Sequence, residues 1–201
     1  MSNTAEPTDE EAALLDAALG RIAEKGYVSL ALSELATIAN VPLATVYRAF
    51  PNKTAILEAL IRRVDLALLS EAVDPGASAR DRLFDLLMRR FEALAPYRAA
   101  VRVVYRDMKR RPAEALALAP TMIRAMDWII DIAGLSGGGA IRPLRAPALG
   151  ALYASVVPVW LDDDDPGLAR TMAALDRRLR RVEEVVERLQ PKPRQSDGGN
   201  A

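Results

Sequence analysis

Residues 32–50 read LSELATIANVPLATVYRAF, and this stretch decides the fold. Its pattern predicts a short helix over residues 32–39 and a second one over residues 43–49. Between them lies Asn40, a residue type that tolerates the left-handed backbone conformation. The stretch therefore predicts two short helices joined by a tight turn.

The apolar residues of this stretch have the spacing of a helix-turn-helix. Leu35, Ala36 and Ile38 lie on the first helix, and Val46 lies on the second. The small Ala36 allows the two helices to cross closely. A helix-turn-helix places its second helix in the DNA major groove, while the N-termini of neighbouring helices hold phosphates. The pattern thus indicates that the partner of this protein is double-stranded DNA that contains an operator.

Helical periodicity continues on both sides of this stretch, and no convincing alternation of period two predicts a strand. Gly26 supplies a C-terminal stop for the first helix. The expected helices span about residues 8–26, 32–39, 43–49, 53–71, 79–94, 97–110, 113–132, 143–161 and 166–189. The sequence therefore predicts an all-α fold of about nine helices.

The helical pattern divides the chain into three segments. We expect an N-terminal helix-turn-helix domain over residues 1–52 and a helical ligand-binding and dimerisation domain over residues 53–190. The sequence Asp74-Pro75-Gly76 is a clear break within the second segment. Residues 191–201 are polar and rich in proline and glycine, so they have nothing to bury and are expected to be disordered.

The composition excludes several classes of enzyme. The chain has 201 residues and no histidine or cysteine, so it has no Ser-His-Asp triad, no thiolate nucleophile and no zinc site of the usual ligands. We find no nucleophile–base pair and no cofactor motif elsewhere in the sequence. We therefore expect that the protein is not an enzyme and that it binds neither a cofactor nor a metal ion.

Charge is balanced overall but not along the chain, with 27 basic and 27 acidic residues. Residues 1–65 carry six basic and nine acidic side chains, which is unfavourable for neutralising phosphates. Residues 80–112 carry ten basic and four acidic side chains. This basic segment forms either a solvated face or a contact with anionic lipid headgroups or an acidic partner.

Neither a signal peptide nor a membrane span is expected. The N-terminus is acidic and lacks an apolar segment. The longest uncharged run, Ala146 to Leu161, has sixteen residues, fewer than the ~20 that cross a bilayer. We interpret the run as a helix buried inside a cytoplasmic protein.

One part of the sequence resembles the N-terminal domain of TetR-type regulators. The resemblance rests on Gly26-Tyr27, Leu35-Ala36, Val41 through Tyr47, and Phe50-Pro51-Asn52-Lys53. It implies a TetR-like fold. It also implies that the protein is a ligand-responsive transcriptional regulator that acts as a homodimer, and we expect it to be a repressor. By this resemblance the DNA-binding residues are Leu43, Ala44, Thr45, Tyr47, Arg48 and Lys53.

The resemblance also implies a role for each polar side chain of that set. Thr45 and Tyr47 would bond phosphates, and Lys53 would add positive charge. Arg48 would reach a base or a phosphate. Leu43 can contact a thymine methyl group but cannot distinguish a donor from an acceptor.

The C-terminal half has a second resemblance. It is similar to the lipid-binding accessory proteins of ubiquinone biosynthesis, which share the TetR fold and are not known to act on DNA. The matching stretches are Val159-Trp160-Leu161-Asp162-Asp163, Thr171-Met172 and Leu175-Asp176-Arg177-Arg178-Leu179. The alternative function is therefore binding of a lipid or isoprenoid. A positive surface around Thr45, Tyr47 and Lys53 would favour DNA, and an apolar or acidic surface would favour the alternative.

Large and flexible side chains cluster in the middle of the chain, where they either fill the core or line a ligand cavity between helices. The sequence has neither a buried histidine nor a recognisable acid pair there, so we expect an apolar small-molecule or lipid effector. The candidate ligand-binding residues are Met88, Phe91, Tyr105, Met122, Met126, Trp128 and Tyr153.

Two helices near the C-terminus predict a dimer. The last helix is expected to begin with Asp165 as N-cap and Pro166 at its first position. It carries a heptad seam formed by Leu168, Met172, Leu175, Leu179, Val182, Val186 and Leu189. The preceding helix presents small residues, which permit close approach of a partner helix. We expect a four-helix interface across a two-fold axis through Leu149, Leu152, Val156, Met172, Leu175, Leu179 and Val182. The alternative is that both helices bury these residues inside the monomer.

Overall fold

The computed structural model describes residues 9–70, 72–135 and 142–189, with the backbone alone for residues 185–189. Its helices are α1 (Asp9–Lys25), α2 (Leu32–Ile38), α3 (Leu43–Ala49), α4 (Lys53–Leu69), α5 (Ala79–Leu94), the 3-10 helix η1 (Ala95–Tyr97), α6 (Arg98–Lys109), α7 (Pro112–Ile132), α8 (Arg142–Leu161) and α9 (Ala169–Leu189). The described residues contain no strand, so the predicted all-α fold is confirmed. The expected tail, residues 191–201, lies outside the described residues.

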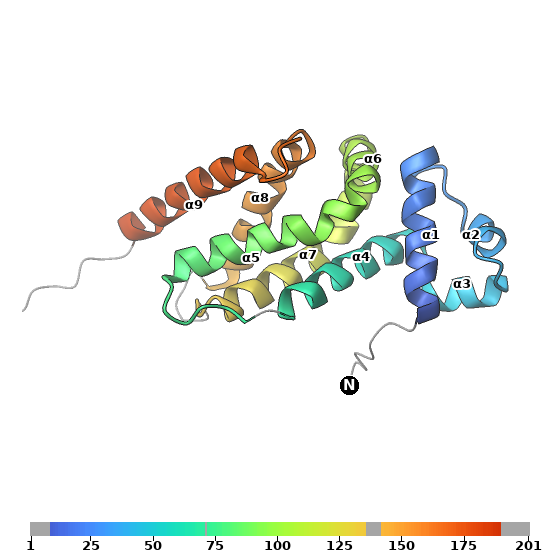
Figure 1. The fold of residues 1–201 in the computed structure, drawn as a ribbon, viewed down its shortest axis with the longest axis horizontal. Coiled ribbons are helices and arrows are strands. Elements are labelled where there is room, and N and C mark those ends of the chain that lie inside the picture. Colours follow the sequence, from blue (N-terminus) through green and yellow to red (C-terminus); the bar gives the residue numbers. More distant parts are fainter. Residues whose placement is uncertain (1–8, 71, 136–141, 190–201) are drawn as a thin grey trace, which may run out of the picture.

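The helices form two groups (Figure 1). Helices α1, α2 and α3 lie together at one end, and α5 to α9 form a bundle that extends away from them. Helix α4 contacts α1 and also packs against α5 and α7 in the bundle. Because α4 belongs to both groups, the division at residues 52 and 53 stays a prediction.

The small N-terminal group is held by a compact apolar core. Leu35 of α2 and Val46 of α3 are completely buried in this core, and the two helices pack against each other. The turn between them closes where Val41 N donates to Ala36 O at 3.0 Å. Asn40 takes the left-handed conformation at φ 52°, as its residue type predicted. Gly26 ends α1 with φ 99°, a conformation that glycine adopts without a steric penalty.

The bundle core is built around three aromatic side chains. The ring of Phe91 stacks on that of Tyr153 at 4.7 Å, and its centroid lies 5.7 Å from that of Trp160. The guanidinium of Arg98 lies over the Trp160 ring at 4.9 Å. Phe91, Tyr153 and Trp160 come from α5 and α8, so these contacts fix α8 against α5.

Arginines from α6 cap the C-terminal end of α8. Arg98 Nη1 donates to Asp163 O at 2.7 Å, and Arg102 donates to the backbone oxygen of Leu161. The last carbonyls of a helix have no partner within the helix, so these bonds satisfy groups that would otherwise need water. The same contacts hold α6 across the end of α8.

Helix α9 begins at Ala169, three residues later than the expected start at Pro166, so that prediction was wrong. The reason is Leu168, whose backbone is left-handed at φ 52° and cannot belong to the helix. Asp165 still caps the helix, because its Oδ2 accepts from Ala169 N at 3.1 Å. The fully buried Asp163 gives a second cap, since its Oδ2 accepts from Thr171 N at 2.8 Å and from Thr171 Oγ1 at 2.7 Å.

By length and composition alone, α8 is the one described helix that could cross a membrane. Its residues Leu149, Leu152, Val156 and Trp160 are buried against other helices of the same chain. This pattern is typical of a core helix, as the sequence predicted.

The buried carboxylate of Asp163 predicts a pH-dependent contribution to stability. Burial alone would raise its pKa, but the two hydrogen bonds from Thr171, a backbone hydrogen bond from Asp165 and the charge of Arg170 together lower the pKa. A carboxyl group whose pKa is lower in the folded than in the unfolded state stabilises the fold at pH values above its unfolded-state pKa of about 3.9. This stabilisation is lost as the pH falls through the folded-state pKa. Replacing Thr171 with valine removes one donor, so we expect Thr171→Val to lower the unfolding free energy at pH 7 by about 1–3 kcal/mol.

Urea unfolding between pH 7 and pH 3 checks this expectation. The difference between wild type and Thr171→Val should shrink below about pH 4, as Asp163 becomes protonated. The control is Thr37→Val, because Thr37 is exposed on α2 and should change stability by less than about 0.5 kcal/mol. Equal effects of the two substitutions would contradict the role of Asp163.

Candidate nucleic-acid interface

The exposed face of α3 is apolar. Leu43 is 54% exposed and Tyr47 is 63% exposed, and Ala44 is exposed between them. Together with Leu32 of α2 they line an open hollow of about 350 Å³. A partner that contacts this face therefore meets mainly hydrocarbon and the hydroxyl group of Tyr47.

The polar side chains of α3 contact one another. Arg48 Nη2 donates to Thr45 Oγ1 at 3.2 Å, and Arg48 Nε lies 3.3 Å from Ala44 O, which accepts its hydrogen bond. Arg48 is exposed, and Thr45 is half-buried. The guanidinium therefore lies along its own helix and must swing outward to reach a base or a phosphate.

Lys53 starts α4 beside the loop that joins α1 to α2. Its Nζ donates to Val28 O at 2.7 Å. Asn52 caps the same helix, since its Oδ1 accepts from Ala55 N at 2.9 Å. The six predicted DNA-binding residues thus lie on α3 and at the start of α4.

One negative charge of the helix-turn-helix domain is neutralised by an ion pair that no local sequence pattern predicted. Arg21 on α1 is buried and forms an ion pair with Glu34 on α2. The hydrogen bond from Arg21 lowers the pKa of the Glu34 carboxyl group. Glu34 therefore connects α1 to α2, and Arg21 balances its charge.

Four of the candidate ligand-binding residues are buried in the bundle: Met88, Phe91, Met126 and Tyr153. Met122 and Tyr105 are half-buried at its edge. Trp128 is 66% exposed on the outer side of α7, so the structure does not bring it together with the others. It points outward because its helical position lies opposite the buried Met126 and Ile130.

The bundle core also contains an ion pair that the sequence analysis did not find. Arg90 is 1% exposed, pairs with Asp65 of α4, and lies 5.5 Å from the centroid of the Tyr153 ring. Burial raises the pKa of Asp65 although Arg90 opposes the shift, and burial raises the pKa of Tyr153 to about 12. Arg90 Nε and Trp160 Nε1 have no hydrogen-bond partner among the described residues. Arg90 and Asp65 lie 25 positions apart in the sequence, so no local sequence pattern could predict their ion pair.

Most of the predicted dimer residues are buried inside their own chain. Leu149, Leu152 and Val156 of α8 and Leu175 and Leu179 of α9 are at most 8% exposed. Within one chain these side chains are therefore covered, and their place in a dimer interface stays a prediction. The physical reason is that α9 packs against both α8 and α5, so its apolar seam faces two helices of the same chain. Met172 and Val182 remain 38% and 44% exposed.

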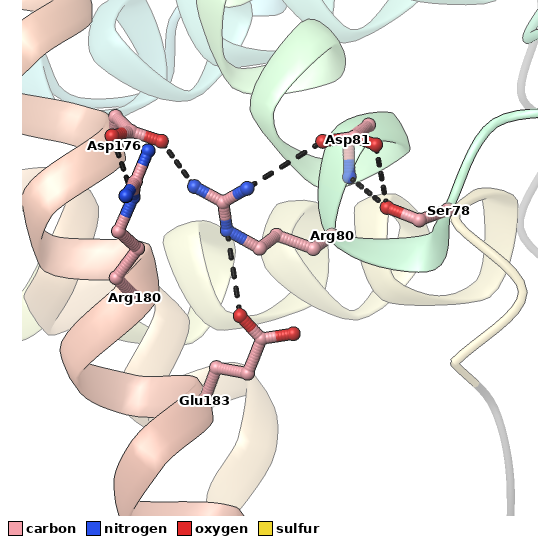
Figure 2. Close-up of polar contacts among 6 residues, drawn as sticks. All are labelled: Ser78, Arg80, Asp81, Asp176, Arg180 and Glu183. Atoms are coloured by element: carbon pink, nitrogen blue, oxygen red, sulfur yellow. Dashed lines mark hydrogen bonds and ion pairs between the residues drawn. The ribbon is translucent and has the colours of Figure 1, made fainter.

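An arginine on α5 holds α9 in this position (Figure 2). Arg80 forms an ion pair with Asp176, and its Nε lies 3.5 Å from Glu183 Oε2. Arg180 Nε also lies 2.9 Å from Asp176 Oδ2. The side chains of Val186 and Leu189, the last two of the heptad seam, lie outside the described residues.

A different face of α8 is open. Its exposed residues recur every three or four positions and carry no charge: Leu144, Pro147, Ala148, Ala151, Ala154 and Ser155. We call this set the outer face of α8. Arg178 of α9 borders it, because Arg178 Nη2 donates to Ser155 O at 3.2 Å.

Residues 14–60 match a known family, described as bacterial regulatory proteins, tetR family. This match covers α2, α3 and the start of α4, which carry the candidate interface. No curated protein matches the chain.

Several solved structures resemble the chain over most of its length. A TetR transcriptional regulator from Nitrosomonas europaea has 21% identity and a TM-score of 0.69, covering 87% of this chain and 98% of its own. The fatty acid degradation regulator FadR from Bacillus halodurans has 19% identity and a TM-score of 0.62, covering 87% and 97%. NalD from Pseudomonas aeruginosa, the secondary repressor of the MexAB-OprM multidrug efflux pump, has 20% identity and a TM-score of 0.52, covering 87% and 97%. The chain therefore matches the tetR family of bacterial regulatory proteins over residues 14–60, and its described residues have the fold of the TetR transcriptional regulators that it resembles.

Proposed function

We propose that this protein is a cytoplasmic transcriptional repressor that binds its operator as a homodimer and releases it when an apolar effector enters the bundle. The observation that carries the proposal is the helix-turn-helix, with α3 exposed beside the start of α4. One structural neighbour, NalD, is named a repressor, which supports repression over activation.

The residues of the interface divide into two kinds of contact. Tyr47, Thr45 and Lys53 offer hydroxyl and ammonium groups to phosphates, which position a protein on DNA without reading sequence. Leu43 and Ala44 offer methyl groups, which match the C5-methyl group of thymine in the major groove. The guanidinium group of Arg48 can donate hydrogen bonds to a base or a phosphate once its own bond to Thr45 Oγ1 is broken.

These two kinds of contact predict opposite behaviour of two variants. Lys53→Ala should weaken binding equally for every duplex and reduce the salt slope by about one. Leu43→Ala should weaken binding only where thymine is contacted, because the alanine side chain is too short to reach the methyl group. Replacing thymine by uracil in the duplex should therefore weaken the wild type but not Leu43→Ala.

The measurement is fluorescence anisotropy with duplex DNA from the region upstream of the protein's own coding sequence, over a series of salt concentrations. Tyr47→Phe keeps the ring and removes the hydroxyl group, so it should also weaken binding of every duplex while leaving the fold intact. No measurable affinity of the wild type for any duplex at low salt would end the regulator proposal.

A second candidate function is supported by the apolar character of α3. Leu43, Tyr47 and Leu32 leave an apolar hollow where a strongly positive face would favour DNA. The alternative is a protein that binds a lipid or isoprenoid and does not act on DNA. It predicts co-purified lipid together with an absence of duplex binding, and the anisotropy measurement separates the two functions.

We propose that the homodimer forms through the outer face of α8. Small side chains at Ala148, Ala151 and Ser155 allow a partner helix to approach closely, and none of the residues of this face is charged. Stable dimers of this kind bury about 2,000 Å² or more and are apolar at the centre. A two-fold axis through this face would bring two copies of α8 together, with α9 of each copy beside them.

Ala151→Glu should convert the dimer to a folded monomer, since Ala151 is exposed within its own chain. The matched control is Ala117→Glu, which places the same charge on an exposed position of α7. Sedimentation velocity at micromolar concentration reports the result. The proposal fails if the wild type sediments as a monomer or if Ala151→Glu remains a dimer.

We also propose that the effector binds between α5, α7 and α8, where Met88, Phe91, Met126 and Tyr153 gather. Methionine side chains are flexible and can move aside for an apolar molecule. Gly150 lies against this region, since a Cβ atom placed on it would lie 3.7 Å from Met126 Cγ.

Palmitic acid and farnesol are suitable probes of an apolar site. Either should raise the melting temperature of the wild type, with about 2.7 kcal/mol of stabilisation at a hundredfold excess over Kd, and should weaken duplex binding. Met126→Phe adds bulk at the buried position and should abolish the shift, whereas Trp128→Phe on the exposed side of α7 should retain it. The same response in both variants would place the ligand elsewhere.

A further inference from the structure

The basic segment at residues 80–112 separates into two groups in the structure. Six of its ten cations bond groups within the described fold: Arg80 with Asp176, Arg82 with Ala133 O, Arg89 with Asp85, Arg90 with Asp65, Arg98 with Asp163 O, and Arg102 with Asp162. The other four are Arg106, Lys109, Arg110 and Arg111, where α6 ends and α7 begins. Their contacts are with near neighbours in the chain: Arg106 Nε lies 3.7 Å from Asp107 Oδ1, Lys109 Nζ lies over the Tyr105 ring, and Arg111 pairs with Glu114. These four residues, together with Lys25 of α1, are called the basic corner.

The basic corner surrounds an open hollow of about 390 Å³ between the helix-turn-helix domain and the bundle. Lys25, Val28 and Ser29 line it from the α1 side, and Arg106, Arg110 and Arg111 line it from the other side. Figure 1 shows α6 beside the end of α1, in agreement with the contacts between these two helices. Lys25 and Arg106 are each 64% exposed, so both ammonium and guanidinium groups are accessible.

The carboxylates near the corner do not cancel its charge. Asp107 lies in the wall of the hollow, and its Oδ2 accepts from Tyr27 N at 3.2 Å. Glu114 forms an ion pair with Arg111 at 2.8 Å. The side chain of Arg110 has no ion pair among the described residues. Glu34 lies 4.0 Å from Lys25 Nζ, although it is already paired with Arg21. Five cations therefore face three carboxylates, and the corner keeps a net positive charge.

The helix-turn-helix domain itself lacks such charge. Over residues 9–52 its cations are Arg21, Lys25 and Arg48, against six acidic side chains. Arg21 is already paired with Glu34. Affinity for duplex DNA comes largely from cations that neutralise phosphates, so a regulator built on this domain needs positive charge from elsewhere.

Val28 connects the hollow to the DNA-binding face. It lines the hollow, and its backbone oxygen accepts the hydrogen bond from Lys53 at 2.7 Å. The basic corner is therefore separated by one short loop from a residue that contacts phosphate in the proposed function. A DNA strand that passes Lys53 can continue onto the corner.

We propose that the basic corner is a second DNA-backbone contact, through which the end of α6 neutralises phosphates flanking the sequence read by α3. This inference rests on the proposed DNA-binding function. It assigns to Arg106 and Arg110 a contribution to affinity that does not depend on base sequence. A small phosphorylated molecule in the hollow is the competing occupant.

The first experiment compares two variants that lose equal charge. Arg106→Gln with Arg110→Gln removes two cations of the corner, and Arg124→Gln with Arg142→Gln removes two exposed arginines of α7 and α8 outside it. Duplex affinity is measured over a salt series, with the protein's own upstream region and a scrambled duplex. The corner variant should lose roughly tenfold or more in affinity for both duplexes, and its salt slope should fall by at least about one. The control should stay within about twofold of the wild type.

The second experiment locates the DNA directly. The chain contains no cysteine, so Arg110→Cys or Arg142→Cys creates a single attachment point for an iron chelate that cleaves nearby DNA. Cleavage of the backbone beside the α3 footprint is expected from position 110 and not from position 142.

The outcomes separate the two levels of the proposal. If the wild type binds no duplex, both the proposed regulator function and the proposed DNA contact of the basic corner are refuted. If it binds but the salt slope is unchanged in the corner variant and position 110 does not cleave, the corner alone is refuted. A rise in melting temperature with pyrophosphate that the corner variant lacks, without cleavage from position 110, would assign the hollow to a small anion and overturn the DNA contact.

Discussion

The structure depends on how the C-terminal end of α8 is capped. The final carbonyl groups of α8 and the loop after it accept hydrogen bonds from Arg98 and Arg102 of α6, and Asp162 O accepts one from Arg170 at 2.8 Å. Because Arg98 and Arg102 lie one turn apart on α6, that helix is fixed across the bundle. At its other end Asp107 accepts from Tyr27 N. Helix α6 thus connects the helices proposed to dimerise with the domain proposed to bind DNA.

This arrangement decides which side chains remain available. The cations of α5 and of the first part of α6 bond carboxylates and carbonyl groups of other elements, whereas at the end of α6 Arg106 pairs only with its neighbour Asp107 and Arg110 has no ion pair among the described residues. In the same way, α9 lies against α5 through Arg80, which buries Leu175 and Leu179 and leaves the outer face of α8 open. The basic corner and the outer face of α8 are thus two of the surfaces that the packing leaves available, the first charged and the second uncharged.

The sequence predicted the parts of the molecule that local patterns control. Helical periodicity, Gly26 and Asn40 identified the fold and the helix-turn-helix, because each depends on residues a few positions apart. The seam of α9 was recognised as apolar, but periodicity does not say which helix covers an apolar face. The pair of Arg90 with Asp65, the Arg21 pair with Glu34 and the exposed position of Trp128 depend on tertiary packing. The start of α9 was misplaced because Pro166 is typical of a first helical turn, whereas the left-handed Leu168 delays the helix.

Hydrogen–deuterium exchange of the whole protein, with and without duplex DNA from its own upstream region, tests the central claim most directly. The claim is that α3, the start of α4 and the end of α6 form one DNA-binding surface. It predicts slower exchange on DNA binding in two segments, residues 43–53 and residues 106–111, with little change in the middle of α7. Unchanged exchange in residues 43–53 at a DNA concentration that saturates binding would contradict it.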